Sequence, residues 1–136
     1  MKRLLLAAVL LAPAARAATV RVTVTGIRND HGHVVVAICT RAEFLHPSCA
    51  YNARAAAHPG QLTLSITGVP AGTYAAQAFH DENDNGTIDR NFLGLPEEGM
   101  GFSHDAPMHF GPPQFDIAAF TLGTADAVLS FKLRYF

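Results

Sequence analysis

The stretch Thr19-Val20-Arg21-Val22-Thr23-Val24-Thr25-Gly26 alternates between apolar and polar side chains, with three valines in register. Successive side chains of a β-strand point to opposite faces, so this pattern predicts a strand with one buried face. The alternation returns in residues 61–67, where Leu62, Leu64 and Ile66 share a face. These two stretches indicate a protein built from half-buried strands.

Further strands are expected on both sides of this pattern. The Val-rich run His33–Cys39 follows the turn residues 29–32, which predicts a β-hairpin with the first strand. Residues 73–80 and 127–136 are also predicted strands, the latter with Leu129, Phe131, Leu133 and Tyr135 on one face. Short helical turns are expected at 41–45 and 116–120, and residues 51–60 indicate a loop or a weak edge strand.

Five strands without a long helix favour an all-β fold, an antiparallel β-sandwich, with a half-buried barrel as the alternative. A parallel sheet would require crossover helices, which the pattern does not offer. From Asp81 to Phe115 the periodicity stops and Gly and Pro recur, which predicts one long irregular loop. Such a loop in a small domain is uncommon and is often functional.

The N-terminus has the form of an export signal. Met1-Lys2-Arg3 is positively charged, Leu4–Ala12 is apolar but too short to span a bilayer, and Ala15-Arg16-Ala17 suits signal peptidase. We therefore expect a signal peptide at 1–17 and a single β-sandwich domain at 18–136. Residue 18 is Ala, so no cysteine follows the cut for lipid attachment, and a periplasmic or secreted protein without a transmembrane segment is predicted.

Charge and cysteine content narrow the function. Without the three basic residues of residues 1–17, seven Lys and Arg remain against 11 Asp and Glu. Proteins that bind nucleic acid ordinarily carry a basic surface, so this acidic balance excludes a nucleic-acid partner. Cys39 and Cys49 are the only cysteines, and in an oxidising compartment we expect them to form a disulfide. Their spacing does not match a Cys-x-x-Cys redox pair.

The segment Asp81–Asp89 carries the most specific chemical pattern. Counted from Asp81, side chains with oxygen stand at positions one, three, five and nine, and Gly86 stands at six, as in the first nine positions of an EF-hand loop. Such a loop also directs the backbone carbonyl of position seven to the ion. The predicted Ca²⁺ ligands are therefore Asp81, Asn83, Asn85, Thr87 and Asp89.

The EF-hand pattern is incomplete. Position 12 is Phe92, where an EF-hand has a bidentate Glu, and the flanking segments are predicted strands rather than helices. Glu97, Glu98 and Asp105 are candidates to complete the coordination, with an affinity on the order of 10⁻⁴ to 10⁻³ M. The alternative is a solvated turn rich in Asp and Asn.

Several motifs together resemble a known family. They are Gly68–Tyr74, Phe79–Gly86, Asn91–Gly94, Gly101–Ser103 and Phe110–Phe115. With these motifs the chain resembles the exported bacterial domain-of-unknown-function family 2141 (DUF2141), over nearly all of residues 18–136. The resemblance implies a periplasmic or secreted β-sandwich similar to transthyretin-like domains, and it implies no activity.

Other constellations suggest competing sites. Ser103-His104-Asp105 has the residue types of a catalytic triad, but consecutive side chains point in different directions. His80, His104 and His109 are candidate ligands for copper or zinc. Phe92, Phe102, Phe110 and Phe115 indicate either a small second core or an apolar groove for a ligand.

Three functions follow from these observations. The favoured one is an exported, non-enzymatic binding or structural module with a Ca²⁺-stabilised acidic loop and a cell-envelope partner. The second is a periplasmic copper or zinc binder, and the third is an enzyme that uses the carboxylates of the acidic loop as acid and base.

Overall fold

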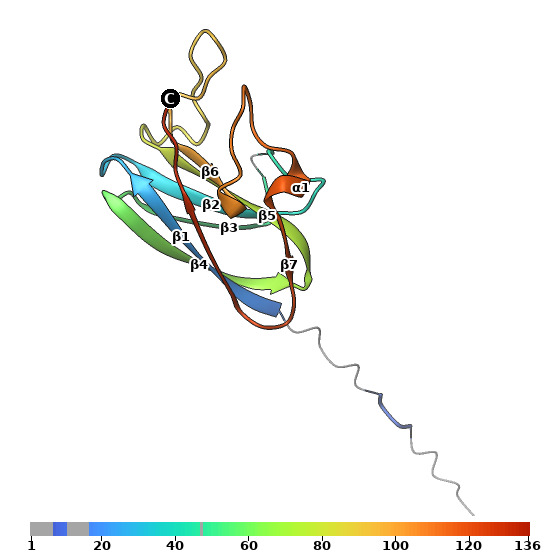
Figure 1. Ribbon diagram of the computed structural model, residues 1–136. Coiled ribbons are helices and arrows are strands. Elements are labelled where there is room, and N and C mark those ends of the chain that lie inside the picture. The colour runs from blue at the N-terminus through green and yellow to red at the C-terminus, as the bar shows by residue number, and fades with distance from the viewer. Residues whose placement is uncertain (1–6, 11–16, 47) are drawn as a thin grey trace, which may run out of the picture.

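The computed structural model describes residues 7–10, 17–46 and 48–136, and these form two β-sheets packed face to face (Figure 1). The first sheet has the order β4 (Gly60–Pro70), β1 (Ala17–Ile27), β8 (Ala127–Lys132). The second has the order β3 (Tyr51–Ala56), β2 (His33–Cys39), β5 (Gly72–Asp81), β6 (Met100–Phe102), and β7 (Ala119–Leu122) also pairs with β5. The predicted all-β sandwich is confirmed, whereas most of the predicted signal peptide, residues 1–6 and 11–16, lies outside the described residues.

The core between the sheets follows directly from the alternating pattern. Val20, Val22 and Val24 of β1 are fully buried, and Val34 and Val36 of β2 meet them from the opposite sheet. Each such valine stabilises the fold by about 1.5 kcal/mol or more relative to an exposed one. Arg21 and Thr23, between the valines of β1, lie on the outer side of the first sheet, whereas Ala37 and Cys39 on the outer side of β2 are buried.

The predicted hairpin between the first two strands is wrong. β1 pairs with β4 and β8, while β2 pairs with β3 and β5, so the turn at 29–32 carries the chain from one sheet to the other. Both strands have one face of valines. Because β1 and β2 lie in opposite sheets, the two valine faces are buried against each other in the core. Gly32 in this turn has φ 64°, and a Cβ there would lie 1.9 Å from the Asp81 carbonyl oxygen, so only glycine permits this crossing beside the end of β5.

One strand pairing departs from the predicted antiparallel arrangement. β8 pairs with β1 in parallel, with Val22 opposite Leu129. The prediction assumed that a parallel pair requires a crossover helix. Here the strands are the first and last of the chain, and the whole second sheet lies between them in sequence and serves as the crossover.

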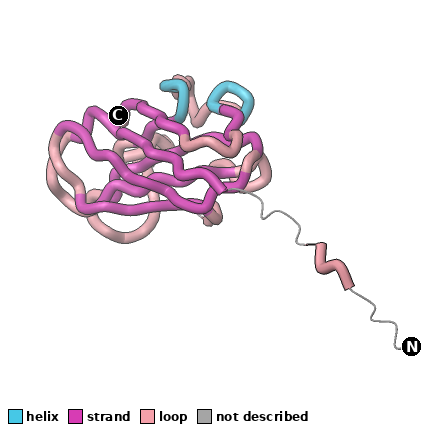
Figure 2. Tube along the Cα trace, turned by 90° about the horizontal axis from the view of Figure 1, so that it is seen from below, coloured by secondary structure: helices cyan, strands magenta, loops and turns pink. Residues whose placement is uncertain are grey.

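The segment 81–115 is more ordered than predicted. It contains β6 and the short 3-10 helix η1 (Ser103–Asp105), and β7 follows directly after the single turn α1 (Phe115–Ala118). The two helical segments lie close together at one side of the sandwich (Figure 2). These elements have three or four residues each, which is too short for a periodic sequence signal.

A second, smaller core joins these elements to β2 and β5. Phe44 packs edge-on against Phe102 and Phe115, and the Cys39–Cys49 disulfide is buried beside them. The predicted disulfide is therefore confirmed. The disulfide closes the loop that carries Phe44. On the chain-entropy model, a disulfide across a loop of this length stabilises the fold by roughly 3 kcal/mol.

Two excursions project from one end of the sandwich, on the side where the chain ends (Figure 1). The first, residues 89–98, is a hairpin closed by the Glu97 amide, which donates to the Asp89 carbonyl at 2.7 Å, and by a bridge between Arg90 and Pro96. We call it the 89–98 hairpin. The second excursion comprises residues 106–113. In the part of the chain that the structure describes, no helix has the length and apolar character to cross a membrane.

Candidate acidic-loop site

The acidic loop begins at the buried end of β5. The Asp81 carboxylate accepts hydrogen bonds from the amides of Gly86 (2.8 Å) and Asn85 (3.2 Å), and the residue is only 4% exposed. The loop closes back on Asp81 because Gly86 has φ 76° and turns the chain sharply. Asp81 is thus held inside the curve of the loop.

The middle of the loop converges on Asp89. The side-chain amides of Asn83 and Asn85 donate to the two Asp89 carboxylate oxygens at 2.6 and 2.8 Å. The side-chain oxygen of Asn85 in turn accepts from the Thr87 amide at 3.0 Å. The structure therefore brings Asp81, Asn83, Asn85, Thr87 and Asp89 together in one curl, as their spacing predicts.

Glu98 approaches the acidic loop from a separate segment. Its Oε1 accepts a hydrogen bond from the Glu82 amide at 3.2 Å, whereas Oε2 is buried without a hydrogen-bond partner. The residue is 4% exposed, and Asp89 and Asp81 are the negative charges that act on it. A buried carboxylate oxygen without a donor destabilises the fold, because it has lost its hydrogen bonds to water and has gained none within the protein.

The electrostatics of Glu98 reflect this position. Burial, followed by repulsion from Asp89 and Asp81, raises the pKa of Glu98 to about 6, although the amides of Asp89 and Glu82 oppose the shift. Neighbouring Glu82 behaves differently. Burial raises its pKa, but hydrogen bonds from Asn29 and Arg28 outweigh burial, and the pKa of Glu82 lies below its usual value. Glu98 is therefore the carboxyl group of this region that is least compensated by the protein.

The other candidate ligands lie elsewhere. Glu97 is exposed, and Asp105 lies in η1, where its carboxylate accepts from the Lys132 amide at 2.8 Å. Among the described residues, no three His, Cys, Asp or Glu side chains are grouped closely enough to hold a metal ion. A cation in the loop would thus depend on amide and backbone oxygens as much as on carboxylates.

The three candidate histidines do not form a common site. His80 is fully buried, with Nδ1 2.9 Å from the Tyr135 hydroxyl and Nε2 2.6 Å from the His31 carbonyl oxygen. His104 lies in η1, with Nε2 3.0 Å from the Ala119 carbonyl oxygen, and His109 is exposed in the second excursion.

The residues of the triad-like motif also have separate partners. The buried Ser103 hydroxyl accepts from the Ala76 amide at 2.9 Å and donates to the Ala118 carbonyl. His104 and Asp105 have the backbone partners described above. Each of the three side chains therefore ties η1 to a different strand, and they do not face one another.

The four phenylalanines separate into two pairs. Phe102 and Phe115 are buried in the second core, whereas Phe92 and Phe110 are fully exposed on the two excursions. The structure does not assemble them into one groove. Arg90, which the sequence analysis did not single out, lies in the 89–98 hairpin and lines a cavity together with Met108 and Pro112 of the second excursion. The sequence does distinguish Arg90, because it is the only Lys or Arg between Asp81 and Phe115.

Comparison with known proteins places the chain in a family. A family model described as "Uncharacterized protein conserved in bacteria (DUF2141)" matches residues 22–130. No curated protein matches the chain. Among solved structures, a pilus-presented adhesin (Cpa) is similar with 17% identity and a TM-score of 0.32, over 90% of this chain but only 27% of the adhesin chain. A bacterial family and a buried disulfide are consistent with an extracytoplasmic protein. The chain belongs to the DUF2141 family of bacterial proteins.

Proposed function

We propose that this protein is an exported, non-enzymatic binding or structural module of the periplasm or cell surface, in which Ca²⁺ holds the acidic loop. The export signal expected at residues 1–17 and the disulfide support the compartment. The separate hydrogen-bond partners of Ser103, His104 and Asp105 give no support to a catalytic role.

The buried Oε2 of Glu98, which has no donor, is the observation that supports the cation most strongly. Asp89 and Asp81 both repel the Glu98 carboxylate, and a divalent cation beside Glu98 would turn that repulsion into attraction. The Asn83 and Asn85 amides and the Thr87 carbonyl would supply further hard oxygen ligands, which suit Ca²⁺. Glu98 would then take the place of the glutamate that Phe92 replaces in the EF-hand pattern.

Such a cation would join the 89–98 hairpin to the end of β5. Asp89 and Glu98 stand at the two ends of the 89–98 hairpin, and Asp81 ends β5. A cation held by Glu98 together with amide and carbonyl oxygens of the acidic loop would fasten the base of the hairpin to the end of β5. We expect the weak affinity of an extracellular module, on the order of 10⁻⁴ to 10⁻³ M.

A copper or zinc site has less support. Both nitrogens of His80 and one nitrogen of His104 already have partners within the protein. Copper or zinc titration of the His104→Ala variant remains its direct test. An enzyme acting through the acidic carboxylates would need a nucleophile or substrate pocket at the loop.

Calorimetry tests the calcium proposal. Saturating Ca²⁺ should raise the Tm above its value in EDTA by roughly 5 °C, the effect of about tenfold excess over Kd. Glu98→Gln should abolish the rise, and Glu97→Gln, which alters the exposed neighbour, should retain it. An unchanged wild-type Tm, or an equal rise in Glu98→Gln, would overturn the proposal.

A further inference from the structure

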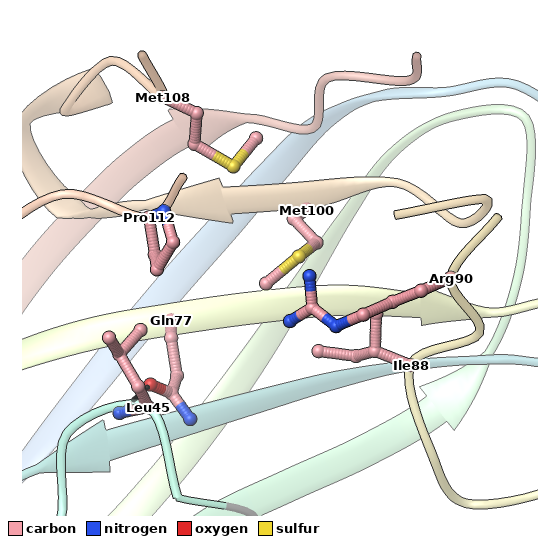
Figure 3. Close-up of a pocket in the computed structure, with 7 residues that line it drawn as sticks. All are labelled: Leu45, Gln77, Ile88, Arg90, Met100, Met108 and Pro112. Atoms are coloured by element: carbon pink, nitrogen blue, oxygen red, sulfur yellow. Dashed lines mark hydrogen bonds between the residues drawn. The ribbon is translucent and has the colours of Figure 1, made fainter. Parts of the chain in front are cut away.

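Two cavities lie beside the 89–98 hairpin and the second excursion, and the smaller one also borders Leu45 and Gln77. One, of about 70 Å³, is lined mainly by apolar side chains, among them Ile88, Met100 and Met108 (Figure 3). The other, of about 180 Å³, lies among Leu95, Phe110 and Phe136. Both are also lined by Arg90, Met108 and Pro112, so the two cavities share part of their wall. We call the two cavities together the Arg90 groove.

Among the described residues that line the two cavities, Arg90 has the only charged side chain. Its side chain extends over Ile88 toward Met100 (Figure 3). Its Nη1 donates to the Gly94 carbonyl at 3.1 Å, and no ion pair involves it among the residues that the structure describes. Most of its five N–H donors are therefore available to a ligand.

The other polar side chain among the described residues of the groove, that of Gln77, already has hydrogen-bond partners. The Gln77 side-chain oxygen accepts from the Leu45 amide at 3.0 Å, and its nitrogen donates to the His46 carbonyl at 3.3 Å. The groove thus offers an apolar wall with one positive charge. An extended peptide fits this chemistry poorly, because its amides would lose water against apolar side chains without gaining hydrogen bonds.

We propose that the Arg90 groove binds a single-chain amphiphile with a terminal carboxylate, in the manner of a short fatty acid. The carboxylate complements the guanidinium, which can bind it through two parallel hydrogen bonds. The acyl chain would lie along the two methionines, whose flexible side chains adapt to apolar ligands. The two cavities together are smaller than the roughly 300 Å³ at which drug-sized pockets begin, which restricts the ligand to one short chain.

Methionine-methyl NMR provides a direct test, because two of the three methionines of the chain line the groove. Sodium octanoate should shift the ε-methyl resonances of Met100 and Met108 saturably, with a Kd on the order of 1 mM. Uncharged 1-octanol should bind about tenfold more weakly, because it lacks the charge-assisted hydrogen bonds. Both titrations are done without Ca²⁺, since the inference does not depend on the cation.

Two variants separate the ligand class from general apolar binding. Arg90→Gln should weaken octanoate about tenfold and leave octanol unchanged. Arg21→Gln, which alters an exposed arginine on β1, should leave both unchanged. Absence of saturable shifts, equal binding of octanol and octanoate, or an Arg90→Gln variant that binds octanoate like wild type would each overturn the proposal.

Discussion

Two buried titratable side chains lie at the same end of β5, and the protein treats them in opposite ways. His80 donates from Nε2 to the His31 carbonyl and accepts at Nδ1 from the Tyr135 hydroxyl, which itself accepts from the Arg28 amide. Glu98 has one carboxylate oxygen bonded and one without a partner. A closed network of this kind needs nothing from outside, whereas an open one leaves a group that an external ligand can satisfy. His80 is therefore structural, and Glu98 is the residue through which a ligand would act.

The largest expected loss of stability comes from removing His80, whose hydrogen bonds are all made within the protein. His80→Leu fills a similar volume but leaves the His31 carbonyl and the Tyr135 hydroxyl without their partner. We expect a loss of about 3 kcal/mol in the free energy of unfolding, from two buried groups left unsatisfied. Urea unfolding should give the same loss in EDTA and in Ca²⁺. A loss confined to Ca²⁺ would instead place His80 in the ion site.

For Glu98, which has an unpaired oxygen, removal of the negative charge should increase the free energy of unfolding. Glu98→Gln replaces the carboxylate by a neutral amide, which the charges of Asp89 and Asp81 do not repel. The pKa of about 6, against 4.5 for an ordinary Glu, corresponds to about 2 kcal/mol of strain in the ionised form. At pH 8 in EDTA, Glu98→Gln should therefore be about 2 kcal/mol more stable than wild type. A less stable variant would show that the ionised carboxylate is satisfied after all.

The same group predicts a pH dependence. Because the pKa of Glu98 is higher in the folded than in the unfolded protein, folding favours its protonated form. Its contribution is fully present below about pH 4.5 and is lost as the pH rises through 6. Between pH 5 and pH 7 in EDTA, wild type should lose about 1 kcal/mol relative to Glu98→Gln. Urea unfolding of both proteins isolates Glu98 from other titrating groups, and parallel pH curves would contradict the assignment.

The strands show how far the sequence leads. The alternation in residues 19–26 predicts β1 and its buried valines, because burial on one face leaves a period of two. The partner of each strand is not encoded in that period. The misassigned hairpin and the parallel pairing of β8 with β1 both depend on how two valine faces meet across the core, over long sequence distances.

The acidic loop shows the same limit at the site. Its local spacing predicts the convergence of Asn83 and Asn85 on Asp89, because Gly86 bends a short stretch of chain. Glu98 was one of three candidate acids, and only its tertiary contact with the Glu82 amide distinguishes it from exposed Glu97. The Arg90 groove could not be predicted, since its walls come from segments far apart in the sequence, from Leu45 and Gln77 to Phe136.

The smallest effect tests whether burial, rather than acidity, makes the difference. Asp84 lies in the same loop but is exposed, at a position outside the predicted ligand set, with its carboxylate 2.6 Å from His33 and 3.8 Å from Arg54. Its backbone has φ 54°, a conformation that Asn tolerates well, so Asp84→Asn adds no strain. Because exposed ion pairs are screened by water, the loss should stay below about 0.5 kcal/mol by urea unfolding, and the rise of Tm in Ca²⁺ should persist. A large loss, or a vanished Ca²⁺ response, would mean that the loop acts through its total negative charge and not through the buried oxygen of Glu98.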